Sequence, residues 1–329
     1  MAALRLLSLS RRARAILRAG AGAGILIAVL VAVGGGAFVR GLAAVSPLTV
    51  AAALALSAVA TVAAAVRWHT VARRLDVPIR LSAAVAACYR SQLLNSVLPG
   101  GVVGDVHRAV AHGLDVGRVA QASRAVAAER IGGQIVQLVF AASVLVIIGA
   151  RAYEPVAGAL GLAAVVAAVV AVACAASARL RRALRRELAH ARIAFGGAGV
   201  IAYVTATSIV VVACHAATFV VACLAVGVPA SPPQLVAVAL LTVLAGSVPL
   251  GIGGWGPRET VAAWAFAMLG LGAADGVAAS TAFGVLATIA VLPGAAVLAA
   301  SARRPRAVRV ALPAERPETG VAFRQESSA

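Results

Sequence analysis

The sequence contains little charge for its size. Charged residues make up 12% of the 329 residues, whereas hydrophobic residues make up 62%, and an average soluble domain has about 25% charged residues. This composition excludes an ordinary water-soluble fold. Several apolar runs reach the roughly 20 residues that a helix needs to cross a bilayer, and they are continuous rather than alternating, which argues against a barrel. The composition therefore predicts an all-α, polytopic helical membrane protein.

Acidic residues and lysine are also scarce. Only 11 residues are acidic and lysine is absent, so the net charge of +18 comes from arginine. In a soluble chain such an excess would indicate nucleic-acid binding. Here the arginines flank apolar runs, and membrane topology explains them because cytoplasmic loops are enriched in basic residues. We expect no nucleic-acid partner.

Sequence motifs for metal, cofactor or nucleotide binding are missing. The four cysteines have no Cys-x-x-Cys spacing, so they predict neither a disulfide framework nor a zinc site. His107 and His112 do not have the His-Glu-x-x-His spacing of a zinc helix, and the sequence contains no Walker loop or dinucleotide fingerprint. Asp105 or Glu259 could act as the base of a membrane-embedded transferase. The sequence contains no recognisable nucleophile–base set to support that function. We expect no cofactor, no metal and no enzymatic activity.

The positions of the arginines predict the topology. Residues 1–19 form a basic cytoplasmic segment, residues 20–300 an integral membrane domain, and residues 301–329 a disordered cytoplasmic tail. Six arginines in 179–192 mark a cytoplasmic loop, and a second basic loop begins at Arg67. Both termini are predicted to be cytoplasmic in a plasma-membrane protein with about eight transmembrane helices. The predicted crossings are Ala21–Val39, Pro47–Val66, Ile131–Ala150, Val156–Ser177, Gly199–Val226, Leu235–Leu250, Thr260–Leu271 and Val277–Ala300.

Two stretches rich in glycine and proline, 95–108 and 246–259, interrupt the apolar sequence and end in charged residues. Hydrocarbon cannot satisfy the backbone groups that such breaks release, so each stretch must be buried in protein or line a wet cavity. The first break ends a predicted re-entrant half-helix, Leu81–Leu98, which is followed by an interfacial segment, Asp105–Arg130. The region 235–271 is either two crossings or a second re-entrant hairpin followed by an interfacial helix.

The two breaks have two interpretations. They are either hinges between crossings or two half-helices that form a binding site near the midplane, as in transporters. In the second interpretation the arginines bind a phosphate with two parallel hydrogen bonds, and the acids hold the arginines in place or exchange protons. In the first, neighbouring charges only pair with each other. The candidate substrate-binding residues are Asn95, Pro99, Gly100, Gly101, Gly104, Asp105, Arg108, Glu129, Arg130, Pro249, Gly253, Gly254, Gly256, Arg258 and Glu259.

Taken together, these motifs resemble the lysylphosphatidylglycerol synthase transmembrane-domain, or flippase-like, family over roughly residues 20–300. The resemblance rests on Leu98-Pro99-Gly100-Gly101, Glu129-Arg130 and the run from Gly253 to Glu259. It implies a bacterial plasma-membrane protein that binds a phospholipid or glycolipid and moves it across the bilayer. The soluble synthase domain of well-known members is not expected here. Arg90 and Pro257 depart from the family's pattern.

The resemblance leaves two functions open. The first is a lipid flippase whose partner is a membrane lipid headgroup. The alternative is a non-transporting scaffold that presents lipid to a separate glycosyl- or aminoacyl-transferase, which would dock on the basic loop 179–192.

Overall fold

The structure, a computed structural model, describes residues 34–148, 177–248 and 253–302, together with the single residues 24, 27 and 31. The predicted crossing Val156–Ser177 lies outside these ranges except for Ser177, as does about half of the predicted crossing Ala21–Val39. The segments 1–19 and 303–329 also lie outside them. Every regular element within them is a helix. The helices are α3 (Gly35–Ala43), α4 (Pro47–Arg74), α5 (Leu81–Val97), α6 (Val103–Asp115), α7 (Val119–Ile148), α9 (Ala178–Ala194), α10 (Ala198–Val226), α11 (Pro232–Gly246), α12 (Pro257–Met268), α13 (Ala273–Ala290) and α14 (Pro293–Ala302).

Long apolar helices support the predicted membrane class. Among the described residues, four stretches are long and apolar enough to cross a bilayer: Pro47–Arg74, Val119–Ile147, Ala198–Val226 and Ala273–Ala300. The last includes α13 and most of α14. The apolar helix α11 has 15 residues, or about 22 Å of length, against a hydrocarbon core of about 30 Å. Four crossings are therefore supported, and the total of eight stays a prediction.

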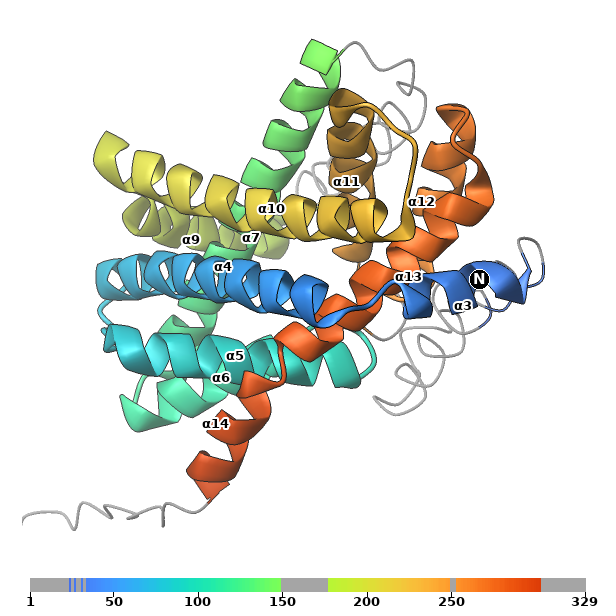
Figure 1. The fold of residues 1–329 in the computed structure, drawn as a ribbon. Helices are drawn as coiled ribbons and strands as arrows, with labels where there is room; N and C mark the ends of the chain where they lie inside the picture. Colours follow the sequence, from blue (N-terminus) through green and yellow to red (C-terminus); the bar gives the residue numbers. More distant parts are fainter. Residues whose placement is uncertain are drawn as a thin grey trace, which may run out of the picture.

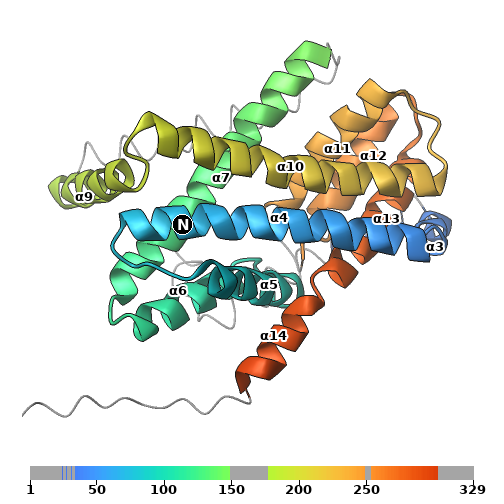
Figure 2. The ribbon, with the colours of Figure 1, turned by 60° about the vertical axis from the view of Figure 1, so that its left-hand side comes forward.

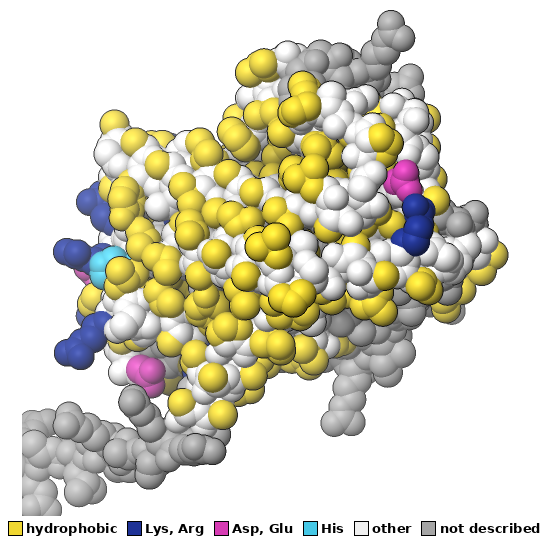
Figure 3. All heavy atoms as spheres, viewed as in Figure 1, with side chains coloured by type: hydrophobic (Ala, Val, Ile, Leu, Met, Phe, Trp, Pro, Cys, Tyr) yellow, Lys and Arg dark blue, Asp and Glu magenta, His cyan; other side chains and the backbone are white. Residues whose placement is uncertain are grey.

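The helices form a bundle in which α4 and α10 lie side by side, with α5 and α6 along one side of α4 (Figures 1 and 2). At the other end of α10, α11 packs against α12, and α12 packs against α13. The helices α4, α11 and α12 each begin with a proline, because the fixed φ of proline suits the first helical position. Apolar side chains cover much of the surface, and basic ones gather where α4 ends and α10 begins (Figure 3).

Two predicted boundaries were wrong. The helix α4 does not end at Val66 but continues to Arg74, so Arg67 is a buried helical residue and not part of a loop. The stretch 105–130 does not form one interfacial segment, because α6 ends at Asp115 and α7 runs without a break from Val119 to Ile148. In both places charged residues remain inside the bundle because they find charged partners there.

The helices α5 and α6 form a hairpin. Its turn uses two glycines with positive φ, Gly100 (95°) and Gly101 (60°), a conformation that only glycine adopts without strain. At the open end, Arg118 Nη1 donates a hydrogen bond of 3.0 Å to the carbonyl of Asp76. The predicted half-helix 81–98 therefore has a returning arm, α6, which ends at Asp115.

We expect cysteines placed at Arg80 and Asp115 to be labelled from the same side of the membrane. The reason is that the hairpin brings the start of α5 and the end of α6 to one end of the bundle. The three native cysteines in the described ranges are buried, and Cys174→Ala removes the fourth. The measurement is labelling of inverted and right-side-out vesicles with a charged maleimide. Labelling from opposite faces would contradict the hairpin.

The turns of the two interrupted motifs meet. A Cβ atom built on Gly253 would lie only 2.9 Å from the carbonyl oxygen of Ser96, at the end of α5, and Gly253 has a φ of +58°. Both the backbone conformation and this close approach require glycine. The sequence therefore places a glycine where the turn before α12 contacts the α5–α6 hairpin.

Candidate functional site

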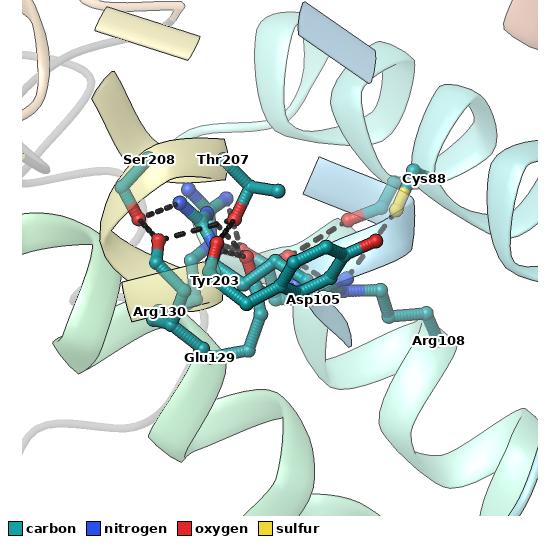
Figure 4. A network of polar contacts seen from close by, with 11 residues as sticks. Cys88, Asp105, Arg108, Glu129, Arg130, Tyr203, Thr207 and Ser208 are labelled. Carbon is teal, nitrogen blue, oxygen red and sulfur yellow. Dashed lines mark hydrogen bonds and ion pairs between the residues drawn. The ribbon is translucent and has the colours of Figure 1, made fainter. Parts of the chain in front are cut away.

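Charged side chains from three helices converge inside the bundle. Asp105 and Arg108 lie on α6, Glu129 and Arg130 on α7, and Arg67 on α4 (Figure 4 labels all but Arg67). We call these five residues the arginine–carboxylate network. All five side chains are connected by ion pairs.

A close approach of α6 to α5 positions Asp105. A Cβ on Gly104 would lie 2.0 Å from the carbonyl oxygen of Ser91, so the helices meet there without a side chain between them. The amide of Gly104 also donates a 2.7 Å hydrogen bond to Asn95 Oδ1. The glycine and the asparagine of the first motif therefore fix the start of α6 against α5.

Asp105 accepts hydrogen bonds from four side chains. Ser91 Oγ (2.9 Å) and Arg108 Nε (3.0 Å) bond to Oδ1, while Asn95 Nδ2 (3.0 Å) and Arg130 Nε (2.7 Å) bond to Oδ2. A carboxylate has about four acceptor sites. The hydrogen-bonding capacity of Asp105 is therefore filled. If one of its four donor side chains moved away, Asp105 would still accept hydrogen bonds from the other three.

Glu129 is the most deeply buried acid of the network, with 1% of its surface exposed. Its Oε1 accepts a 2.9 Å hydrogen bond from Arg67 Nε, and its Oε2 accepts one of 2.6 Å from Arg108 Nη2. Ser208 on α10 accepts a further bond from Arg67, at 2.7 Å. The guanidinium of Arg108 lies 4.8 Å from the centre of the Trp68 ring, a favourable cation–π distance.

Arg130 differs from the other two arginines of the network. Its side chain is 45% exposed, against 7% for Arg67 and 4% for Arg108. Three arginines and two carboxylates leave one positive charge in excess, and the one exposed arginine is where an anion can reach it. The network can therefore hold one negatively charged group at Arg130.

Two hollows meet at Arg130. A cavity of about 210 Å³ lies inside the bundle, lined by all five network residues and by polar side chains such as His215 of α10. A larger groove of about 960 Å³ lies between the α5–α6 hairpin, α7 and the turn around Gly253. Gln92, Asp105 and Arg130 line both hollows. Away from Arg130 the groove is walled by apolar side chains: Val106 and Val110 of α6, and Ile131, Ile135 and Leu138 of α7.

Most predicted residues of the first motif lie at this site. Asn95, Gly101 and Asp105 line the groove, as do Gly253 and Gly254 of the second motif. Arg108 and Glu129 line the cavity. Pro99 and Gly100 belong to the hairpin turn, and Pro249 lies outside the described residues.

The second charged pair forms a separate cluster. Arg258 donates to Glu259 Oε1 from Nε (3.0 Å) and Nη2 (2.6 Å), and to Ser280 Oγ (3.1 Å). Its guanidinium lies between the rings of Trp255 and Phe283, at 4.7 and 5.3 Å from their centres. The amide of Gly256 donates a 2.7 Å bond to Glu259 Oε2. These contacts are those of the structural alternative, in which Arg258 pairs with its neighbour.

We therefore expect Arg258→Ala to lower the amount of folded protein in the membrane. Glu259 has no exposed surface, and leaving one partner of a buried pair uncompensated costs about 3–5 kcal/mol. The measurement is the yield and thermal midpoint of the monodisperse peak in size-exclusion chromatography. Arg40→Ala is the matched control, because the Arg40–Asp275 pair is exposed and such pairs contribute about 0–1 kcal/mol. Equal midpoints for the two variants would contradict this assignment.

Arg67 is the network residue that sequence reasoning missed. Because Arg73 and Arg74 follow it within one to two helical turns, Arg67 was assigned to a basic loop. A signal was present, since the apolar helical pattern continues beyond it through the buried residues Val71 and Ala72. A periodic pattern that continues past a charge indicates a buried charge with a partner.

A bundle of long apolar helices around a buried polar network is typical of an integral membrane protein. Residues 15–294 match the family described as the lysylphosphatidylglycerol synthase TM region, and the chain belongs to this family. The family indicates a membrane protein in a lipid-related process. Comparisons with curated proteins and with solved structures give no match.

Proposed function

We propose that this protein binds a membrane phospholipid or glycolipid by its headgroup phosphate and moves the lipid across the bilayer. The observation that carries this proposal is the groove, which has apolar walls along α6 and α7 and ends at the half-exposed Arg130. An amphiphile fits such a surface, with acyl chains against Val106, Val110 and Ile135 and a phosphate at the guanidinium.

The contacts of Asp105 make Arg130 available to a phosphate. When a phosphate takes over the two donors of Arg130, Asp105 keeps its bonds to Ser91, Asn95 and Arg108. The exchange therefore leaves no buried acceptor without a donor, which would otherwise cost about 1–3 kcal/mol. The anion also neutralises the charge excess of the network. An arginine suits this role because its fork forms two parallel bonds to a phosphate.

The internal cavity favours movement over simple binding. It lies across the Arg130–Asp105 pair from the groove and offers polar partners, among them Gln92 and His215, to a headgroup. A polar group leaving the groove would find hydrogen-bonding partners there, which the acyl region does not provide. The localisation in the plasma membrane with cytoplasmic termini remains part of this proposal.

A groove-filling variant tests the proposal. We expect Val106→Trp to reduce the scrambling of fluorescent phospholipid in proteoliposomes by about tenfold, since the indole occupies the groove beside Asp105. Val146→Trp is the matched control, because Val146 is also exposed but lies towards the end of α7. The measurement is dithionite quenching of labelled lipid, with co-purified lipid quantified in parallel.

The same experiment separates the proposal from the scaffold function. A scaffold would lose bound lipid in Val106→Trp, and the unmodified protein would show no scrambling above that of empty liposomes. Equal scrambling by both tryptophan variants and the unmodified protein would show that the groove is not the lipid path.

A further inference from the structure

The helix α9 carries the strongest concentration of charge among the described residues. Its 17 residues, Ala178–Ala194, include six arginines and one glutamate. It ends four residues before Ala198, where the long apolar helix α10 begins. Figure 2 shows α9 at the end of the bundle where α10 begins. The helix therefore lies next to the point at which a membrane crossing starts.

The arginines and the two exposed leucines of α9 lie on different faces. Leu184 and Leu188 are four residues apart and share one face, and they are 39% and 50% exposed. All six arginines are exposed, and on a helical wheel they occupy the remaining arc around Arg182 and Arg186. An apolar row beside an arginine-rich face is typical of helices that lie in the membrane interface.

Contacts with the bundle fix the orientation of α9. Glu187 accepts hydrogen bonds of 3.0 Å from Arg124 of α7, and this bonding lowers the pKa of Glu187. Near the C-terminal end, Arg74 of α4 donates to the carbonyls of Ile193 (3.3 Å) and Gly196 (2.8 Å). These hydrogen bonds involve only the single acid of α9 and backbone carbonyls at its C-terminal end. Leu184, Leu188 and the arginines remain exposed.

We propose that α9 binds the anionic phospholipid surface of the leaflet from which α10 begins. Leu184 and Leu188 enter the boundary between headgroups and acyl chains, and the arginines bind lipid phosphates beside it. Charge complementarity selects this partner, because six exposed arginines with one acid already paired attract anionic headgroups. The proposal is independent of whether the protein moves lipid. Since Arg124 and Arg130 are both on α7, docking of α9 also restrains the helix that carries the site.

Fluorescent labels on the two faces of α9 test the proposal in the full chain. Leu188→Cys and, as its matched control, Arg186→Cys are each made together with Cys174→Ala, because the described native cysteines are buried. Each variant is labelled with nitrobenzoxadiazole and placed in nanodiscs of phosphatidylcholine alone or with one quarter phosphatidylglycerol. Quenching is measured with neutral acrylamide from water and with spin-labelled lipid from the bilayer.

In anionic nanodiscs we expect the label at residue 188 to be quenched by the spin-labelled lipid and protected from acrylamide, with the opposite result at residue 186. Protection at residue 188 should fall in phosphatidylcholine alone, in 1 M salt, and with Arg181→Gln. Each arginine near an anionic surface contributes about fivefold to the ratio of docked to undocked helix. Equal acrylamide quenching of residue 188 in both lipid compositions would overturn the proposal. Protection that appears only after a soluble protein is added would assign the surface to a protein partner instead.

Discussion

Arg130→Ala should abolish lipid scrambling and leave the amount of folded protein close to that of the unmodified chain. The side chain is 45% exposed, and Asp105 keeps three donors after the change, so the loss of stability is small. Loss of a charge-assisted contact to a phosphate should cost about 1.5–3 kcal/mol, or about ten- to a hundredfold in lipid affinity. The measurement is scrambling in proteoliposomes together with the yield of monodisperse protein.

Two further variants make this result specific. Arg130→Lys keeps the charge but loses the two-pronged hydrogen bonding, so it should restore activity only in part. Arg73→Ala removes an exposed arginine outside the network and should leave scrambling unchanged. Normal scrambling by well-folded Arg130→Ala protein would remove this arginine from the site.

Glu129→Gln should be the most destabilising single change in the network. The carboxylate is the direct partner of both Arg67 and Arg108, and all three side chains are buried. Neutralising it leaves two guanidinium groups without sufficient compensation, for which we expect a loss of about 3–5 kcal/mol. The measurement is the thermal midpoint of the purified protein in detergent, with expression in the membrane as a second readout.

The control for this prediction is Glu187→Gln, which removes an exposed partner of Arg124 and should cost about 0–1 kcal/mol. Adding Arg67→Met to Glu129→Gln should recover part of the loss, because one of the uncompensated charges is then absent. A Glu129→Gln protein as stable as Glu187→Gln would mean that the buried ion pairs contribute little to the fold.

The sequence predicted the helical fold class and singled out Asp105, Arg108, Glu129 and Arg130, because a charge within an apolar chain requires a partner. It placed these residues in an interfacial segment and left open whether they only pair with their neighbours or form a binding site. The pairing between helices was out of reach. Arg67 meets Glu129 across 62 residues of sequence, and no local pattern specifies which helix faces which.

In the second motif the sequence indicated the local pairing but not its surroundings. Arg258 and Glu259 are neighbours in sequence, and their pairing was one of the two interpretations that the sequence left open. The structure adds Ser280 and Phe283 of α13, which complete the surroundings of Arg258. These residues are near Arg258 only because α13 packs on α12, a tertiary contact that the motif does not encode.

The meeting of the two interrupted motifs, at Gly253 and Ser96, has a consequence for the biogenesis of the protein. The α5–α6 hairpin leaves the ribosome long before α11 and α12 are made. Its glycine-rich turn therefore cannot contact the turn around Gly253 until those later segments have been synthesised. Contacts between segments so far apart in sequence form late and slowly. Until then the polar end of the hairpin needs water, lipid headgroups or a chaperone to satisfy it, and a chain arrested after α10 should be an early substrate for membrane quality control.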